Sequence, residues 1–375
     1  MPSFAHTLSR GEIAQLAAYV ASSSRASKTT VAASFKPDKT KLSDCASGDQ
    51  RCYQQAFADL AYYDGPKRAL TIYVHAMATN REIESGCHRI AHAIGAGGLA
   101  HFHGNVAKAF AAGSSACWSG YYHGILERSF AGVPPERLAQ VAQRLCSDPS
   151  IERTTFVLYQ CVHGLGHGLM IYTGYDLPRA LHICHQLQTA WDQTSCTGGV
   201  FMENISTSYG VRSPWLRDDD PLFPCKSVAE RDKLYCYLMA TSRILAVDHY
   251  DWRKTAWWCR KSEPGWVRTC FQSYGRDASG TTRQSPEAIL ALCRITGDMQ
   301  GECIYGAARD MTSNYAGGKQ ASVLCNEAPA RYRSYCFKGI GTIIGSLRAT
   351  LAERGNACAL VTRRYVAACR TGAGA

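Results

Sequence analysis

Apolar residues recur along this chain with the period of an α-helix rather than that of a β-strand. In the segment 135–146, four apolar residues follow the i, i+3, i+4, i+7 spacing of one helix face: Leu138, Val141, Ala142 and Leu145. The segment 286–293 repeats this design, with Ser285 at the cap position and proline at the first helical position. No alternating apolar and polar pattern of useful length is present. The pattern therefore predicts an all-α protein.

Paired cysteines divide this helical pattern into units. From residue 146 onward, seven pairs have members 10 to 15 residues apart: Cys146/Cys161, Cys184/Cys196, Cys225/Cys236, Cys259/Cys270, Cys293/Cys303, Cys325/Cys336 and Cys358/Cys369. The first member recurs at steps of 32 to 41 residues, which is typical of repeat proteins. We expect each unit to be a helical hairpin, whose first helix ends at the first cysteine and whose second begins at the second. The sequence therefore predicts an α-solenoid of disulfide-stapled helical hairpins, similar in layout to the cysteine-rich, tetratricopeptide-like repeat proteins of bacteria. The tetratricopeptide consensus itself is absent.

The remaining cysteines bear on the compartment. The other four keep the total of 18 even, and the sequence leaves their pairing open: Cys45, Cys52, Cys87 and Cys117. Regularly paired cysteines predict an oxidising compartment, periplasmic or extracellular, although the N-terminus has no signal-peptide pattern. No apolar stretch is long enough to span a membrane, so we expect no membrane span. The net charge of +11 is scattered and disfavours a nucleic-acid partner.

The first 22 residues contain a second pattern. They begin Met1-Pro-Ser-Phe and end with a helix in Leu-Ala-Ala-Tyr-Val, opened by the capping box of Ser9 and Glu12. This segment resembles the C-terminal end of a class I cytochrome c, in which a haem-ligating Met-Pro precedes a closing helix ending in Leu-Ala-x-Tyr-Val. The resemblance implies that Met1 is a cofactor-binding haem ligand. Because no Cys-x-x-Cys-His occurs in the chain, haem c would require a missing upstream segment, and we expect translation to start earlier. An ordinary amphipathic helix is the alternative.

The chain divides into four parts. The resemblance implies that residues 1–22 are a cytochrome c remnant, and we expect 23–44, rich in Ser and Lys, to be a linker. Residues 45–210 are helical repeats rich in histidine, and residues 211–375 are cysteine-paired repeats without a histidine cluster. In many units a glycine stands three residues after the second cysteine, at Gly120, Gly164, Gly199, Gly306 and Gly339. Because glycine inside a helix costs about 1 kcal/mol, we expect these glycines to let neighbouring second helices approach closely along a concave side.

Ligand-capable residues gather in four consecutive units of the histidine-rich part. Three i, i+4 pairs share a helix face, and a carboxylate follows in the fourth unit: His88/His92, His123/Glu127, His163/His167 and Glu203. If the second helices line one groove, these side chains converge there. Imidazole and carboxylate ligands predict a transition-metal site, with copper or iron favoured and zinc possible. Histidines in a metal-free polar network or acid/base site are the alternatives.

These features predict an extracytoplasmic metal-binding helical-repeat protein. Fusion to a cytochrome c would connect the site to electron transfer, with a redox partner, and a metal-dependent oxidoreductase activity is the enzymatic hypothesis. The alternative is a disulfide-braced scaffold that binds a protein ligand on its concave face without catalysis. A third hypothesis is a hydrolase-like metal site with Glu127 or Glu203 as the base.

Overall fold

The computed structural model of the chain describes residues 35–114, 116–117, 119–152, 155–206, 212–315 and 317–375. Met1 and the rest of the segment that resembles a cytochrome c lie outside the described residues. Every regular element in the described ranges is a helix, and none is a strand, so the all-α prediction is confirmed. With η marking a 3₁₀-helix, the elements are η1 (Leu42–Asp44), α2 (Gln50–Asp64), α3 (Pro66–Thr79), α4 (Arg81–Ser85), α5 (Cys87–His101), α6 (Val106–Ala111), α7 (Gly120–Ser129), η2 (Pro135–Arg137), α8 (Leu138–Leu145), α9 (Pro149–Glu152), α10 (Thr155–Tyr172), α11 (Leu177–Cys184), α12 (Ala190–Ile205), η3 (Glu230–Asp232), α13 (Lys233–Val247), α14 (Trp252–Arg260), η4 (Pro264–Trp266), α15 (Val267–Thr281), α16 (Pro286–Ile295), η5 (Gly297–Met299), α17 (Gln300–Asn314), α18 (Lys319–Glu327), α19 (Ala330–Leu347), α20 (Leu351–Val361) and α21 (Val366–Ala373).

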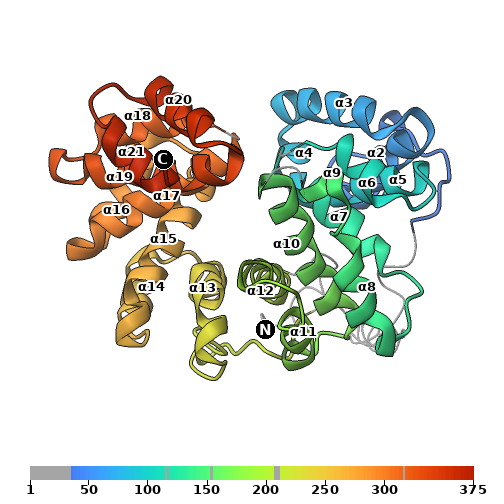
Figure 1. Cartoon of the computed structure of the whole chain (residues 1–375), viewed down its shortest axis with the longest axis horizontal. Helices are drawn as coiled ribbons and strands as arrows, with labels where there is room; N and C mark the ends of the chain where they lie inside the picture. The colour runs from blue at the N-terminus through green and yellow to red at the C-terminus, as the bar shows by residue number, and fades with distance from the viewer. Residues whose placement is uncertain (1–34, 115, 118, 153–154, 207–211, 316) are drawn as a thin grey trace, which may run out of the picture.

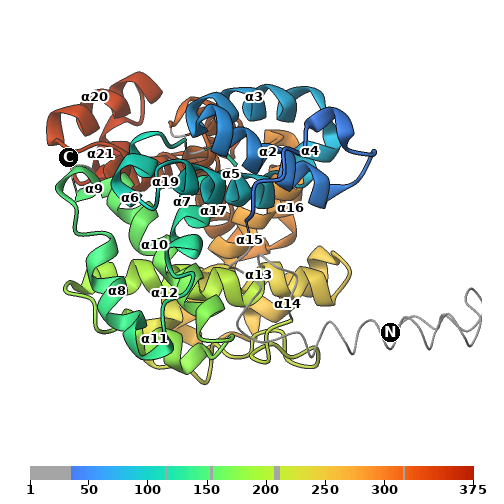
Figure 2. The same cartoon turned by 90° about the vertical axis from the view of Figure 1, so that its right-hand side faces the viewer.

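The inner helices form one row that follows the order of the chain. Each packs on the next, in the order α2, α5, α7, α10, α12, α13, α15, α17, α19 and α21. The row crosses the predicted boundary at residue 210 without a break, because α12 contacts α13. Figures 1 and 2 both place α3, α11 and α20 at the periphery of the molecule. This order is the one expected of stacked hairpins, whereas a regular solenoid stays a prediction.

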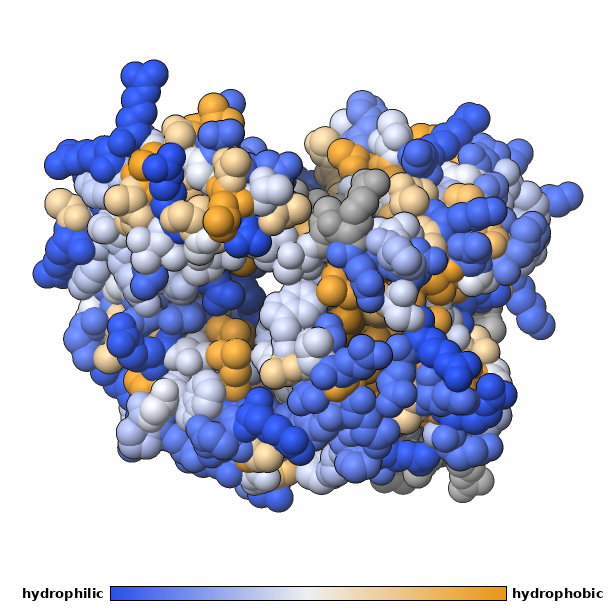
Figure 3. Space-filling model, in the orientation of Figure 1, coloured by the Kyte–Doolittle hydropathy of each residue, from blue (hydrophilic) through white to orange (hydrophobic). Residues whose placement is uncertain are grey.

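The row of inner helices curls so strongly that its distant parts meet. Helix α10 contacts α19, which is five places further along the row. A second contact joins the end of α15 to the N-terminal part of the chain: Nη2 of Arg283, which follows α15, lies 3.8 Å from Oε2 of Glu84 in α4. Figure 1 shows the resulting horseshoe, and Figure 3 shows the surface hollowed near the centre of the view. The two halves of the chain therefore face each other across a central hollow.

All eighteen cysteines are joined in nine disulfides, and the seven predicted pairs are confirmed. The four cysteines that the sequence left open pair as Cys45–Cys52 and Cys87–Cys117. The second of these bonds differs from the staples, because it joins α5 to the segment just before α7. Six of the seven predicted pairs join the end of an outer helix to an inner helix. Cys225 is the exception, because it lies in a series of turns rather than at the end of a helix.

The inner helices begin earlier than the cysteine positions predict. Helix α17 begins at Gln300, before Cys303, and α19 begins at Ala330, before Cys336. A disulfide can join two cysteines only if their Cα atoms are less than about 7 Å apart. Two antiparallel helices bring Cα atoms this close about one turn away from the loop that connects them. The cysteine therefore lies inside the inner helix and does not mark its start.

Two further features of the fold concern positions that the sequence singled out. The predicted close approach at the recurrent glycines is confirmed: a Cβ atom at Gly306 would lie 2.0 Å from the carbonyl oxygen of Gln272 in the neighbouring inner helix. Residues 35–44 of the predicted linker are packed on α2, where the amide of Thr40 donates to Asp59 Oδ2 at 2.9 Å. None of the helices that the structure describes combines the length and apolar character needed to cross a bilayer.

Candidate metal centre

Four consecutive inner helices carry the residues that the sequence predicts as ligands. They are His88 and His92 on α5, His123 and Glu127 on α7, His163 and His167 on α10, and Glu203 on α12. On α5, α7 and α10 the two ligand residues are one helical turn apart and therefore share one face of the helix. Because α5, α7, α10 and α12 pack side by side, the ligand residues of neighbouring helices lie next to one another. The helical phase and the row together therefore bring all seven side chains into one region.

The seven side chains form three overlapping triplets. Within each triplet, one ligand atom from every residue lies within 4.8 Å of the others: His88/His92/His123, His123/His163/His167 and Glu127/His167/Glu203. The first and second triplets share His123, and the second and third share His167. The rings of His92, His123 and His167 have centroids 4.6 to 5.9 Å apart. The prediction that the inner helices bring these imidazoles together is confirmed.

At one end of the cluster, two imidazoles face each other. His88 places Nδ1 3.0 Å from the carbonyl oxygen of Cys117, and its Nε2 lies 3.1 Å from Nε2 of His92. The other nitrogen of His92, Nδ1, lies 2.8 Å from Oε1 of Glu127, although this contact is not aligned as a hydrogen bond. The Cys87–Cys117 disulfide fixes the carbonyl that orients His88. The two facing Nε2 atoms therefore share either one proton or one cation.

At the other end, a carboxylate holds an imidazole. Glu203 Oε2 lies 3.0 Å from Nδ1 of His167, and Oε1 of Glu203 accepts a hydrogen bond of 2.9 Å from the hydroxyl of Tyr175. The side chains of His167 and Glu203 are 1% and 0% exposed. With its Nδ1 facing the carboxylate, His167 directs Nε2 into the cluster, an arrangement common for metal-ligating histidines.

Two buried nitrogens at the centre of the cluster have no hydrogen-bond partner. These are Nδ1 of His123 and Nε2 of His167, whose rings stack with centroids 4.6 Å apart. Leaving a buried polar atom unsatisfied costs about 1–3 kcal/mol, so such atoms are rare in folded proteins. A metal ion would accept the lone pair of each of these nitrogens, for which the protein provides no hydrogen-bond donor. The residues of the cluster therefore suit a metal.

Burial keeps the five imidazoles neutral. It lowers the pKa of His88 and His92 to about 3 each and that of His163 to about 4. The pKa values of His123 and His167 also lie well below the usual range, first through burial and then through the neighbouring histidines. Neutral imidazole is the form that binds a metal ion. At neutral pH no proton therefore has to leave these rings before a metal binds.

The donor set contains only nitrogen and oxygen. Because every cysteine is in a disulfide, no thiolate is available to the cluster. Imidazole nitrogens suit copper, iron and zinc, and carboxylate oxygens add harder donors. The histidines outside the four-unit register do not enter the triplets found among the described residues; His185, for example, places Nε2 2.7 Å from Oδ1 of Asp232.

Two tyrosines near the cluster escaped the sequence analysis. Tyr175 follows α10 in a turn with a positive φ of 62°, so neither helical period nor cysteine register points to it. Tyr159 places its hydroxyl 3.4 Å from Nδ1 of His163, on the same helix and one turn earlier. The i, i+4 spacing of Tyr159 and His163 was the signal in the sequence that could have identified this tyrosine. The hydroxyl of Tyr235 lies 3.4 Å from the hydroxyl of Tyr159 and extends the chain of polar contacts.

Cavities connect the cluster to the central hollow. One of about 560 Å³ is lined by His88, His92 and Ile205 at the end of α12, and one of about 170 Å³ is lined by His123 and His163. The buried ligand atoms are therefore within reach of a small molecule. Comparison of the chain with protein-family models, with curated proteins and with solved structures found no match.

Proposed function

We propose that this chain is an extracytoplasmic protein that binds transition-metal ions in the cluster of five histidines and two glutamates. The convergence of these seven side chains from four separate helices, six of them buried and His88 half-buried, carries the proposal. A single histidine pair is common in protein cores, but three overlapping triplets whose central imidazoles have nitrogens without a hydrogen-bond partner are what a multi-metal site needs. The nine disulfides support the extracytoplasmic location.

The arrangement supports a site for more than one ion. The two outer triplets have no residue in common, and His123 and His167 connect them through the central triplet. Bound copper or iron would supply one-electron chemistry there. The chain's own contribution is to hold the imidazoles neutral and to orient His167 through Glu203.

A connection to electron transfer is the second part of the proposal. It rests on the resemblance of residues 1–22 to the end of a class I cytochrome c, and it favours copper or iron over redox-silent zinc. A metal site beside a haem carrier would exchange electrons with it. Zinc bound in preference to both redox metals would favour the hydrolytic alternative.

Metal analysis tests the proposal. The disulfide-bonded protein, stripped with a chelator and dialysed against Cu(II), Fe(II) or Zn(II), is expected to retain at least one equivalent of metal after desalting. The His163→Ala/His167→Ala variant removes members of two triplets and is expected to lose most of it. The matched control is His75→Ala/His182→Ala, because both of those rings are exposed.

Two results would overturn the proposal. One is a wild-type protein that retains no stoichiometric metal, and the other is equal metal content in the two double variants. Either result would favour the disulfide-braced scaffold. Helix content and melting temperature, measured by circular dichroism, show whether the His163→Ala/His167→Ala variant is folded. If it is not, the single variant His123→Gln takes its place.

A further inference from the structure

The C-terminal half of the chain supplies the wall that faces the metal cluster. The cavity of about 170 Å³ beside His123 and His163 adjoins one of about 400 Å³ that reaches His88. The two cavities share four lining residues, from α12, α13, α15 and α17: Met202, Met239, Arg276 and Asp310. The repeats without a histidine cluster therefore complete the space in front of the histidines.

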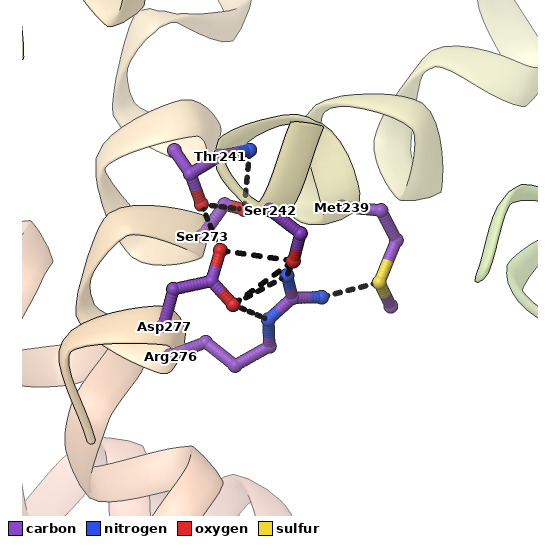
Figure 4. A network of polar contacts seen from close by, with 6 residues as sticks. All are labelled: Met239, Thr241, Ser242, Ser273, Arg276 and Asp277. Atoms are coloured by element: carbon purple, nitrogen blue, oxygen red, sulfur yellow. Dashed lines mark hydrogen bonds and ion pairs between the residues drawn. The ribbon is translucent and has the colours of Figure 1, made fainter. Parts of the chain in front are cut away.

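One arginine of this wall is fully engaged with its neighbours. Arg276 of α15 donates from Nη2 to Oδ1 of Asp277 at 2.7 Å, and it also contacts Ser242 and the sulfur of Met239. Asp277 in turn accepts a hydrogen bond of 2.6 Å from Thr241. Figure 4 shows this network between α13 and α15. Arg276 is thus held rigidly, and Asp277 balances its charge.

A second arginine of the wall, Arg309 of α17, has no such counter-charge. Its Nε atom is buried without a hydrogen-bond partner, and Arg309 makes no ion pair among the residues that the structure describes. Its guanidinium lies over the ring of Tyr305, 5.8 Å from the centroid. A guanidinium that is partly removed from water without an acceptor is unfavourable unless a ligand supplies one.

The smaller cavity has apolar lining residues as well. Leu238, Met239 and Ile343 line it together with Met202, and uncharged polar residues such as Gln160, Gln272 and Ser313 complete the lining. Its charged lining residues are Arg276, which is already paired with Asp277, and Arg309 and Asp310. A ligand that matches this lining has one negative group for Arg309 and an apolar body for the methionine and isoleucine side chains.

We propose that the hollow binds a small organic carboxylate, with its carboxylate on Arg309 and its apolar part between Met202 and Ile343, beside His123 and His163. This inference deepens the proposed function, because it names the substrate class of the same site, and it rests on that function for the ligand's reactivity. Guanidinium–carboxylate pairing is short and directional, so Arg309 would fix which end of the ligand approaches the histidines.

The test uses benzoate as the probe and benzamide as its neutral analogue. Isothermal titration of the metal-loaded protein is expected to show saturable binding of benzoate and at least tenfold weaker binding of benzamide. Arg309→Gln is expected to weaken benzoate binding at least tenfold, whereas Arg309→Lys keeps the charge and part of the affinity. Arg294→Gln is the matched control, because Arg294 is exposed on α16, and it is expected to bind as wild type does.

The metal content of each variant separates the two proposals. Arg309→Gln is expected to retain the wild-type amount of metal, because Arg309 belongs to none of the three triplets. Absence of saturable benzoate binding to metal-loaded wild type, equal affinity for inorganic phosphate, or undiminished benzoate binding in Arg309→Gln would overturn the carboxylate proposal alone. A wild-type protein without metal that still binds benzoate through Arg309 would leave the anion site standing and overturn the metal site.

Discussion

Gly199 of α12 lies directly against the backbone of His163 in α10: a Cβ atom built on Gly199 would be 1.8 Å from the carbonyl oxygen of His163. The contact is reciprocal, since a Cβ atom on Gly166 of α10 would be 2.0 Å from the carbonyl oxygen of Cys196 in α12. Real Cβ atoms do not come so near a backbone oxygen. The two helices that carry His167 and Glu203 are therefore spaced by glycine, and the 3.0 Å contact between those side chains depends on this spacing.

Replacing Gly199 with alanine should force α10 and α12 apart. Alanine favours a helix by about 1 kcal/mol over glycine, but overpacking against a backbone oxygen costs about 1–3 kcal/mol or more. We expect a net loss of stability, measured by chemical unfolding, together with lower metal content. Gly265→Ala is the control, because nothing lies within 4 Å of a Cβ atom at Gly265. Wild-type stability and metal content in Gly199→Ala would show that the helices tolerate a wider spacing.

Removing the charge of Glu203 should affect only one end of the cluster. Glu203 belongs to the triplet with Glu127 and His167, but not to the triplet of His88, His92 and His123. Glu203→Gln keeps the size of the side chain and is expected to lower the metal stoichiometry without abolishing it. Glu287→Gln, at an exposed position in the first turn of α16, should bind as wild type does. Complete loss of metal from Glu203→Gln would mean that the triplets do not bind separately.

Opening different disulfides should separate stability from metal binding. The bond Cys358–Cys369 closes a short loop at the end of the row, between α20 and α21, whereas Cys184–Cys196 anchors α12, which carries Glu203. Replacing either pair with alanine is expected to cost about 2–4 kcal/mol in the free energy of unfolding. Only the Cys184/Cys196 variant should also lose metal affinity. Equal loss of metal in both variants would mean that the row transmits strain along its whole length.

Local patterns in the sequence predict much of this protein. Helical phase and cysteine register are enough to place His123 and His167 on the same face of successive inner helices, because each unit repeats the same local geometry. No α-helix is found in the described residues 212–232 that precede α13, and Pro214, Pro221 and Pro224 are the sequence signal that disfavours one there.

The far side of the hollow could not be predicted in this way. Arg309 faces His123 and His163 only because small rotations between successive inner helices add up until α10 meets α19. No residue pattern within one unit determines that sum. Arg309 also lies in a unit without histidine, so its own surroundings in the sequence give no indication of a site.

The location of bound metal tests the central claim most directly. Crystals of the protein loaded with copper, measured at the copper absorption edge, would show each ion as a peak in the anomalous difference map. The account predicts peaks among the imidazole and carboxylate groups of His88, His123, His167 and Glu203, at nitrogen distances of about 2.0 Å. A map with no peak inside the cluster, or with copper only at exposed histidines such as His75, would contradict it.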